Sequence, residues 1–186
     1  DGAALSLPDI GWRKAEGAKA RLSMCGRLSE GGVSLDAFDL QSDDLSAAGA
    51  AKLGAKGDPL SADFSRLQYR GAIDLALKLG NKNGIWSVNA KGPLLDLTKL
   101  KDLTGPALEG EGEADETHFH ANVDIDRVRV TDDLFFRGLN GFVERGESGL
   151  KLSLNGKVAG GAAVSVALDR GADGGTVSME ADDAGR

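Results

Sequence analysis

The sequence is poor in the residues that mark disulfide-linked, metal-binding or nucleic-acid-binding proteins. Cys25 is the only cysteine among 186 residues, which excludes an intramolecular disulfide and a CxxC metal site. Its type predicts a small, buried apolar side chain. The formal net charge is −7 and no basic stripe offsets it, so nucleic acid is not an expected partner. The same charge disfavours direct adsorption to an anionic membrane.

Long hydrophobic runs and catalytic motifs are also missing. The longest uncharged run, VAGGAAVSVAL at 158–168, is shorter than the roughly 20 residues of a membrane-spanning helix. No GxSxG, HExxH or GxxxxGK[ST] motif occurs, and no histidine has the sequence context of a nucleophile's base. We therefore expect a protein that is not an enzyme and needs no cofactor. No signal peptide is evident, and the chain opens without methionine, which suggests a fragment of something longer.

Aromatic residues make up only 5% of the chain, whereas glycine is abundant, with 27 residues. This is about twice the average share of glycine. Glycine favours turns between short segments, so aliphatic side chains must supply most of the packing. The hydrophobic content of 41% and charged content of 27% are ordinary for a folded globular protein.

Apolar residues alternate with polar residues along most of the chain, which is the pattern of half-buried strands. Glycine-containing turns bound most of these runs, and hardly any helical period separates them. This spacing predicts a mainly β, curved antiparallel meander. The apolar members of the runs are Ala20, Leu22 and Met24; Val33, Leu35 and Ala37; Phe119, Ala121, Val123 and Ile125; Leu150, Leu152 and Leu154; Val164, Val166 and Leu168; and Val177, Met179 and Ala181.

The stretch YRGAIDLALKLGNKNGIWSVNAKG at 69–92 is typical of a β-hairpin. Its turn GNKNG is rich in residues that tolerate positive φ. Placing Leu79 opposite Gly84 predicts the pairs Leu77–Trp86, Leu75–Val88 and Ile73–Ala90. This register gathers the apolar side chains on one face.

The apolar positions change parity twice along the chain. They are odd-numbered up to Ile125 but even at Val128 and Val130, so a bulge or bend is predicted at Asp126 or Arg127. A similar change lies between Ala37 and Leu40. Because bulges increase strand twist and curvature, the sheet is expected to bend.

One segment departs from the alternating pattern. GPLLDLTKLKDLTG at 92–105 has leucines every three residues, after Pro93 and before Gly105, which predicts a short α or 3₁₀ helix near residues 93–104. This helix is expected to cover the core. The following run EGEGEADE reads as a solvated acidic loop. The loop divides one continuous β segment, 1–186, into possible sub-segments 1–108 and 117–186.

Several residues are of types that occur in binding sites. His118 and His120 share a face of a predicted strand, but no further ligand is suitably spaced, so no metal is expected. The aspartate pairs at 43–44, 132–133 and 182–183 are expected to cap backbone amides in turns. Trp12 and Trp86 are too few for a stacking platform and are expected to fill the core.

The order of several motifs resembles the AsmA-like superfamily, specifically the YhdP-type proteins of the bacterial cell envelope, which are related to TamB-like bridge proteins. The resembling stretches are LSLPDIGWRKAEGAKARL, GPLLDLTKL, ANVDIDRVRV followed by LNGFVERG, and MEADDAG. They span nearly the whole chain.

The resemblance implies a taco-like β-groove with an apolar concave side that conducts phospholipid acyl chains through the periplasm. It also implies an inner-membrane anchor outside this fragment, and a role in transport from the inner to the outer membrane and in outer-membrane homeostasis. The predicted groove lining is Ile73, Leu75, Leu77, Leu79, Trp86, Val88, Phe119, Val123, Ile125, Leu150, Leu152, Leu154, Val164, Val166 and Leu168.

Alternation alone leaves other functions open, because a groove wall and a closed core have the same pattern. A structural or partner-binding module, built as a closed β-sandwich or barrel without a ligand, is the main alternative. A lipid hydrolase ranks third, since it would need a nucleophile and a base that the sequence does not offer.

Overall fold

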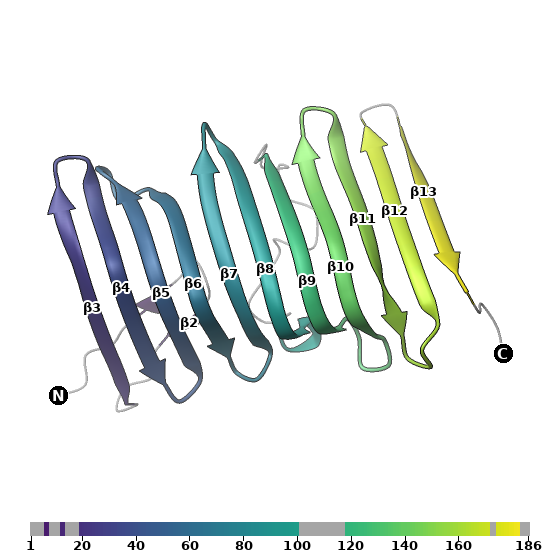
Figure 1. Cartoon of the computed structure of the whole chain (residues 1–186), viewed down its shortest axis with the longest axis horizontal. Helices are drawn as coiled ribbons and strands as arrows, with labels where there is room; N and C mark the ends of the chain where they lie inside the picture. The colour runs from purple at the N-terminus through teal and green to yellow at the C-terminus, as the bar shows by residue number, and fades with distance from the viewer. Residues whose placement is uncertain (1–5, 8–11, 14–18, 101–117, 172–173, 183–186) are drawn as a thin grey trace.

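The structure, a computed structural model, describes residues 6–7, 12–13, 19–100, 118–171 and 174–182. Eleven strands form one sheet in the order β13-β12-β11-β10-β9-β8-β7-β6-β5-β4-β3 (Figure 1). The end strands β3 and β13 do not pair, so the sheet is open. The strands are β3 Ala20–Ser29, β4 Gly32–Ser42, β5 Leu45–Gly54, β6 Pro59–Tyr69, β7 Ile73–Lys82, β8 Ile85–Asp96, β9 Phe119–Arg129, β10 Phe135–Gly146, β11 Gly149–Val158, β12 Ala163–Gly171 and β13 Gly174–Ala181. A separate small pair joins β1, Ser6–Leu7, to β2, Trp12–Arg13.

This architecture confirms the predicted mainly β, curved meander. One junction differs from a pure antiparallel meander, because β8 and β9 run parallel, with Trp86 beside Phe119 and Leu95 beside Val128. A parallel pair needs a connection of a dozen or more residues, and residues 97–118 provide that length. The two predicted sub-segments therefore contribute to one continuous sheet. The acidic run that separates them lies outside the described residues.

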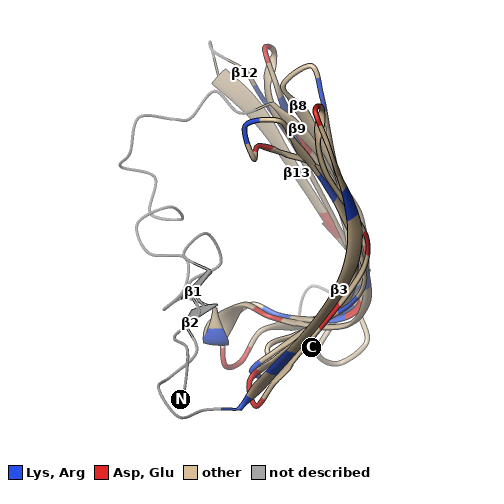
Figure 2. Cartoon of the chain, turned by 90° about the vertical axis from the view of Figure 1, so that its left-hand side faces the viewer, with Lys and Arg blue, Asp and Glu red and all other residues tan. Residues whose placement is uncertain are grey.

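The strands bend into an arc, which is visible when the sheet is viewed from its side (Figure 2). Changes in which residues face inward accompany the bend. On β9, Ile125 and Val128 are both buried, while Asp126 and Arg127 between them are both exposed. This is the parity change predicted at Asp126 or Arg127. Two consecutive outward residues lengthen the outer surface of the strand, so the sheet curves toward its apolar side.

The second predicted parity change lies slightly earlier than expected. The pairing of β4 with β5 shifts between Leu35 and Phe38, and Asp36 and Ala37 are both exposed. Ala37 therefore does not belong to the apolar face. Exposing the small alanine side chain costs little free energy, whereas burying the larger Phe38 ring gains far more.

The β7–β8 hairpin has a different register from the predicted one. Leu79 pairs with Val88, Leu77 with Ala90 and Ile73 with Leu95. The turn is the two-residue Asn83–Gly84, whose φ values of 55° and 82° suit a tight hairpin turn of the Asn-Gly type. Compared with the predicted register, the β8 partner of each β7 residue shifts by an even number of residues as far as Ala90, beyond which a bulge follows. The apolar side chains therefore keep their predicted face.

The helix occupies less of the predicted range than expected. Strand β8 continues through Pro93 to Asp96, and the 3₁₀ helix η2 covers Leu97–Lys99. Pro93 therefore does not start the helix. Asp96 is its N-cap, and its side chain accepts a hydrogen bond from the backbone N–H of Thr98, as short polar caps commonly do. The remaining predicted positions, 101–104, lie outside the described residues.

Two small apolar clusters pack at the edge of the sheet where β8 ends. Leu40, Leu45 and Tyr69 form one, and Leu75, Ile125 and Val128 form the other. Leu97 packs against the second cluster and Leu100 against the first, so the helical turn bridges them on the concave side. Lys99 adds a hydrogen bond of 3.2 Å from its Nζ to the Gly71 carbonyl. The predicted covering role of this segment is thus confirmed for Leu97 and Leu100.

Gly141 offers a test of strand packing at the floor of the arc. Its φ is 143°, and an added Cβ would overlap the carbonyl oxygen of Ser153 on β11. We expect Gly141→Ala to lower the free energy of unfolding by about 2 kcal/mol, measured by urea denaturation. Gly146→Ala on the same strand is the control, because nothing lies within 4 Å of its added Cβ. Equal stability of the two variants would contradict the packing described.

Candidate functional site

The concave face of the sheet carries the predicted apolar lining. Strand pairing places all fifteen predicted lining residues on this face, because directly opposed residues point the same way. One row crosses every strand at mid-height. It consists of Met24, Phe38, Gly49, Phe64, Leu77, Ala90, Val123, Gly141, Leu154, Val166 and Met179.

Glycine makes room for aromatic rings in this row. Phe38 and Phe64 meet edge to face across β5, with ring centroids 5.6 Å apart, and Gly49 lies between them in the strand order. A side chain at Gly49 would overlap the Asp63 carbonyl. The glycine therefore allows both close strand pairing and contact between the rings.

Most of the concave face is neither sealed nor fully open to solvent. Leu75, Ile125 and Val164 are buried, and they lie at the edge where the two clusters pack. The other predicted lining residues are half-buried: Ile73, Leu77, Leu79, Trp86, Val88, Phe119, Val123, Leu150, Leu152, Leu154, Val166 and Leu168. A closed core would bury most such aliphatic side chains. The face is therefore a trough with a packed lower wall and a partly accessible remainder.

The trough is open at both ends of the sheet. On β3, Leu22, Met24 and Leu28 are 45%, 58% and 83% exposed, and on β13 Val177 and Met179 are 69% and 68% exposed. These side chains continue the concave rows of their neighbours. Cys25 also lies on β3 and is exposed, so the prediction of a buried cysteine was wrong. An edge strand has a neighbour on one side only and cannot bury it.

The upper rim, defined here as the edge with the β7–β8 and β10–β11 turns, has a different composition. Its row runs Trp86, Phe119, Arg145, Leu150 and Arg170. Arg145 and Arg170 are the charged residues that the pairing of β3–β13 places on the concave face. The apolar pattern does not mark these two arginines, although one further step of the alternation from Leu168 reaches Arg170.

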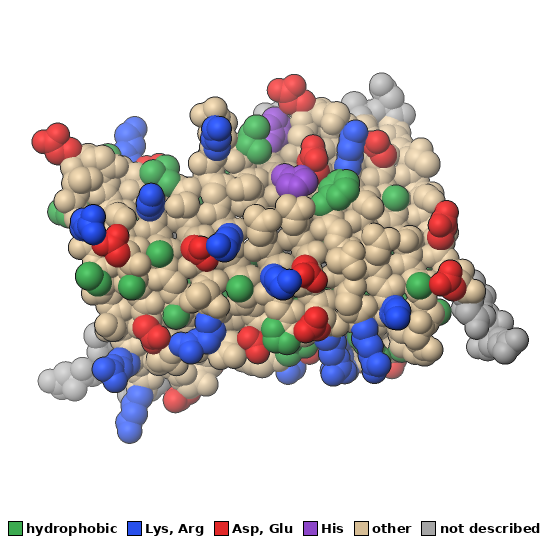
Figure 3. Space-filling model, in the orientation of Figure 1, with side chains coloured by type: hydrophobic (Ala, Val, Ile, Leu, Met, Phe, Trp, Pro, Cys, Tyr) green, Lys and Arg blue, Asp and Glu red, His purple; other side chains and the backbone are tan. Residues whose placement is uncertain are grey.

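The convex face is polar, as Figure 3 shows. Lys91 Nζ and Asp124 on the adjacent strand lie 2.7 Å apart, and the hydrogen bond and charge of Asp124 raise the pKa of Lys91. Solvent screens such exposed pairs, so they make this face polar and contribute little to the stability of the fold. The other pairs between strands are Arg27–Asp36, Arg66–Asp39, Lys78–Asp63, His120–Glu144 and Lys151–Asp169.

His120 belongs to this polar face. Its ring nitrogens lie 3.4 Å from Glu144 and 3.2 Å from Asn122, and the ring stacks on Phe142. His118 precedes β9, and its backbone carbonyl accepts a hydrogen bond from Trp86. Within the described ranges, no group of three or more His, Cys, Asp or Glu is placed to hold a metal.

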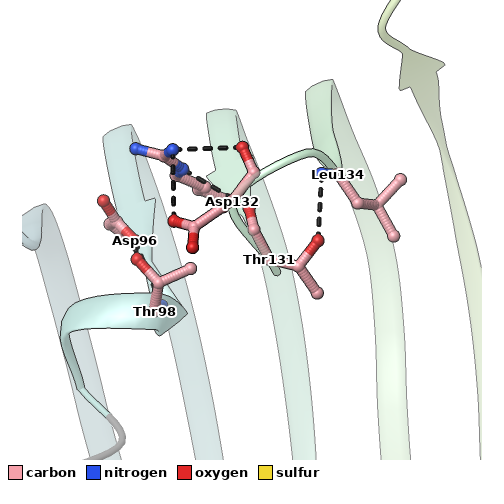
Figure 4. A network of polar contacts seen from close by, with 6 residues as sticks. Asp96, Thr98, Thr131, Asp132 and Leu134 are labelled. Carbon is pink, nitrogen blue, oxygen red and sulfur yellow. Dashed lines mark hydrogen bonds and ion pairs between the residues drawn. The ribbon is translucent and has the colours of Figure 1, made fainter.

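In the two turns with described aspartate pairs, hydroxyl groups cap backbone amides, a role that the prediction gave to the aspartates. In the turn at 43–44, the Ser42 hydroxyl accepts a hydrogen bond from the backbone N–H of Leu45. In the turn at 132–133, the Thr131 hydroxyl accepts one from the backbone N–H of Leu134. Asp44 and Asp132 form ion pairs with Arg70 and Arg129. Figure 4 shows the second turn beside Asp96. A hydroxyl can both donate and accept, which suits it to these tight turns. Asp183 and the Trp12 side chain lie outside the described residues, whereas Trp86 is half-buried in the trough.

Asp96 is the one buried charged residue in the part of the chain that the structure describes, with 5% of its surface exposed. Burial alone would raise its pKa. Hydrogen bonds from the Thr98 amide and hydroxyl, at 3.1 and 2.5 Å, together with the charges of Arg129 and Lys99, outweigh burial and lower the pKa below the ordinary 3.8. The ionised carboxylate thus fixes the start of η2.

Comparison with protein-family models, with curated proteins and with solved structures finds no match to this chain. Within the described residues, none of the helices has the length and apolarity to cross a membrane.

The Asp96 cap predicts a specific response to acid. Because its folded pKa is lowered, its stabilisation is fully present above the unfolded value near 4 and is lost as pH falls through the folded value. Asp96→Asn should lower the free energy of unfolding by about 1 kcal/mol at pH 7. The difference from wild type should shrink below about pH 4, measured by urea unfolding across pH. The control Asp133→Asn changes an exposed turn residue. A constant difference between Asp96→Asn and wild type at every pH would exclude this role.

Proposed function

We propose that the protein is a segment of a lipid conduit whose concave face shields phospholipid acyl chains. The observation that carries this proposal is an apolar face that crosses all eleven strands and remains half-exposed. Exposed apolar patches beyond a few hundred Å² are rare on monomers unless they bind something. Acyl chains suit this face because its lining below the upper rim is apolar and mostly aliphatic, and lacks the convergent polar groups of a specific pocket.

The dimensions of the sheet support a path rather than a pocket. Ten strand spacings of about 4.8 Å give a trough about 48 Å long, running across the strands. One leaflet of a bilayer has a hydrocarbon thickness of about 15 Å, so the trough exceeds the length of a lipid tail. The exposed apolar residues of β3 and β13 leave both ends open, which suits passage along the trough.

The cellular setting belongs to the same proposal. An inner-membrane anchor, a periplasmic location and phospholipid movement toward the outer membrane follow from the AsmA-like resemblance. The proposed role is non-enzymatic. The alternative of a closed module loses support, because the described sheet is open and the trough side chains are half-buried.

A pair of neighbouring substitutions tests the conduit. Leu77 is half-buried in the middle row of the trough, and Ala76 is exposed on the convex face. Leu77→Glu and Ala76→Glu add the same charge at adjacent positions on opposite faces. We expect Leu77→Glu to fold and to carry several-fold less co-purified phospholipid, measured by mass spectrometry. Ala76→Glu should keep the wild-type amount.

The sealed-core alternative makes the opposite prediction. Burying an unpaired glutamate costs roughly 3–5 kcal/mol, so Leu77→Glu would unfold in a closed module. Unfolding of Leu77→Glu beside a folded Ala76→Glu, or equal lipid content in both, would contradict the conduit. Thermal unfolding measured on the same samples separates these outcomes.

A further inference from the structure

The upper rim offers an anion-binding element that a purely aliphatic trough does not need. Arg145 and Arg170 lie in one concave row, on either side of Leu150. Two strand spacings separate them, which is about 10 Å between their backbones. Both residues are exposed. Long, flexible arginine side chains from these positions can converge on one group above Leu150.

The two arginines differ from the cations of the convex face. There, Arg27, Arg66, Lys78, Lys91 and Lys151 each lie within 3.5 Å of a carboxylate on another strand. The described residues provide no such carboxylate for Arg145 or Arg170. On the concave face their row-mates are Trp86, Phe119, Leu150 and Gly175, none of which is charged.

The backbone beside the pair allows close approach of β11 and β12. Gly149 has a φ of 109°, and an added Cβ there would overlap the Arg170 carbonyl. This glycine allows β11 and β12 to pair up to the rim, which holds the Arg170 backbone beside Leu150. The positions of both arginines therefore rest on regular strand pairing and not on a loop.

The rim row has the composition of a membrane interface. Aromatic rings and arginines stand at one edge, and aliphatic side chains such as Leu152 and Leu168 follow directly below. Aromatic and basic side chains of this kind occupy the level of lipid headgroups, where the polar end of each side chain stays wet. Guanidinium groups bind phosphate through paired, charge-assisted hydrogen bonds.

We propose that Arg145 and Arg170 bind the phosphate of a phospholipid whose acyl chains lie on the aliphatic rows below them. This inference rests on the proposed conduit and adds a headgroup site at its upper rim. It means that the trough orients its lipid, with the phosphate toward the β10–β11 turn and the tails toward Leu152 and Leu168.

The test compares two short-chain lipids with identical tails, dioctanoyl phosphatidic acid and dioctanoylglycerol, by isothermal titration of the wild-type chain. We expect phosphatidic acid to bind about tenfold more tightly than dioctanoylglycerol, because the free energy of a hydrogen bond to a charged group corresponds to about a tenfold change in affinity. In Arg145→Gln/Arg170→Gln this preference should vanish while the affinity for dioctanoylglycerol stays the same. The matched control Arg137→Gln/Lys157→Gln removes two exposed cations that are paired in register on the convex face of β10 and β11, and should keep the preference.

Each other outcome overturns a defined part of the account. If wild type binds both lipids equally, or if the control loses the preference as well, the arginine site is wrong and the conduit stands. If glycerol phosphate binds as tightly as phosphatidic acid, the arginines bind free anions and not lipids. If neither lipid binds wild type, the conduit fails and the headgroup site fails with it.

Discussion

The shape of this protein depends on where its strands place two consecutive residues on the same side. At Asp36–Ala37 on β4, Ser65–Arg66 on β6 and Asp126–Arg127 on β9, two consecutive residues face outward while the flanking apolar residues face inward. An extra outward residue bends a strand toward its other face. Repeated along the sheet, this turns a flat apolar surface into a trough.

The bend sets the roles of the two faces. Cross-strand ion pairs such as Lys91–Asp124 and Lys151–Asp169 keep the convex side polar. Among the described strands, only the short pair β1–β2 lies on the concave side of the eleven-stranded layer (Figure 2). Local packing at Leu97 and Leu100 closes only the edge near η2. The rest of the aliphatic surface therefore favours an apolar ligand, and the proposed conduit follows from this imbalance.

The sequence predicted which face each side chain occupies better than it predicted which residues pair. Leu75, Leu77 and Leu79 lie on the predicted face although the predicted hairpin register was wrong. The tight Asn83–Gly84 turn shifts their partners on β8 by an even number of residues, which leaves the face unchanged. The parallel pairing of β8 with β9 was missed, since alternation is the same in parallel and antiparallel strands. Pro93 suggested a helix start because its φ suits both a helix and an extended strand next to a bulge. The rim arginines were not predicted because a charged residue at an inward position breaks the apolar alternation of its strand.

Direct contact between lipid and the concave face is the central claim, and site-specific photocrosslinking measures it. A photoreactive residue would replace Val88 or Leu168 in the trough, and Ser87 or Ala167 as the adjacent convex control. After illumination with radiolabelled phospholipid, the account predicts strong labelling at Val88 and Leu168 and background labelling at Ser87 and Ala167. Equal labelling at all four positions, or none at Val88 and Leu168, would contradict it.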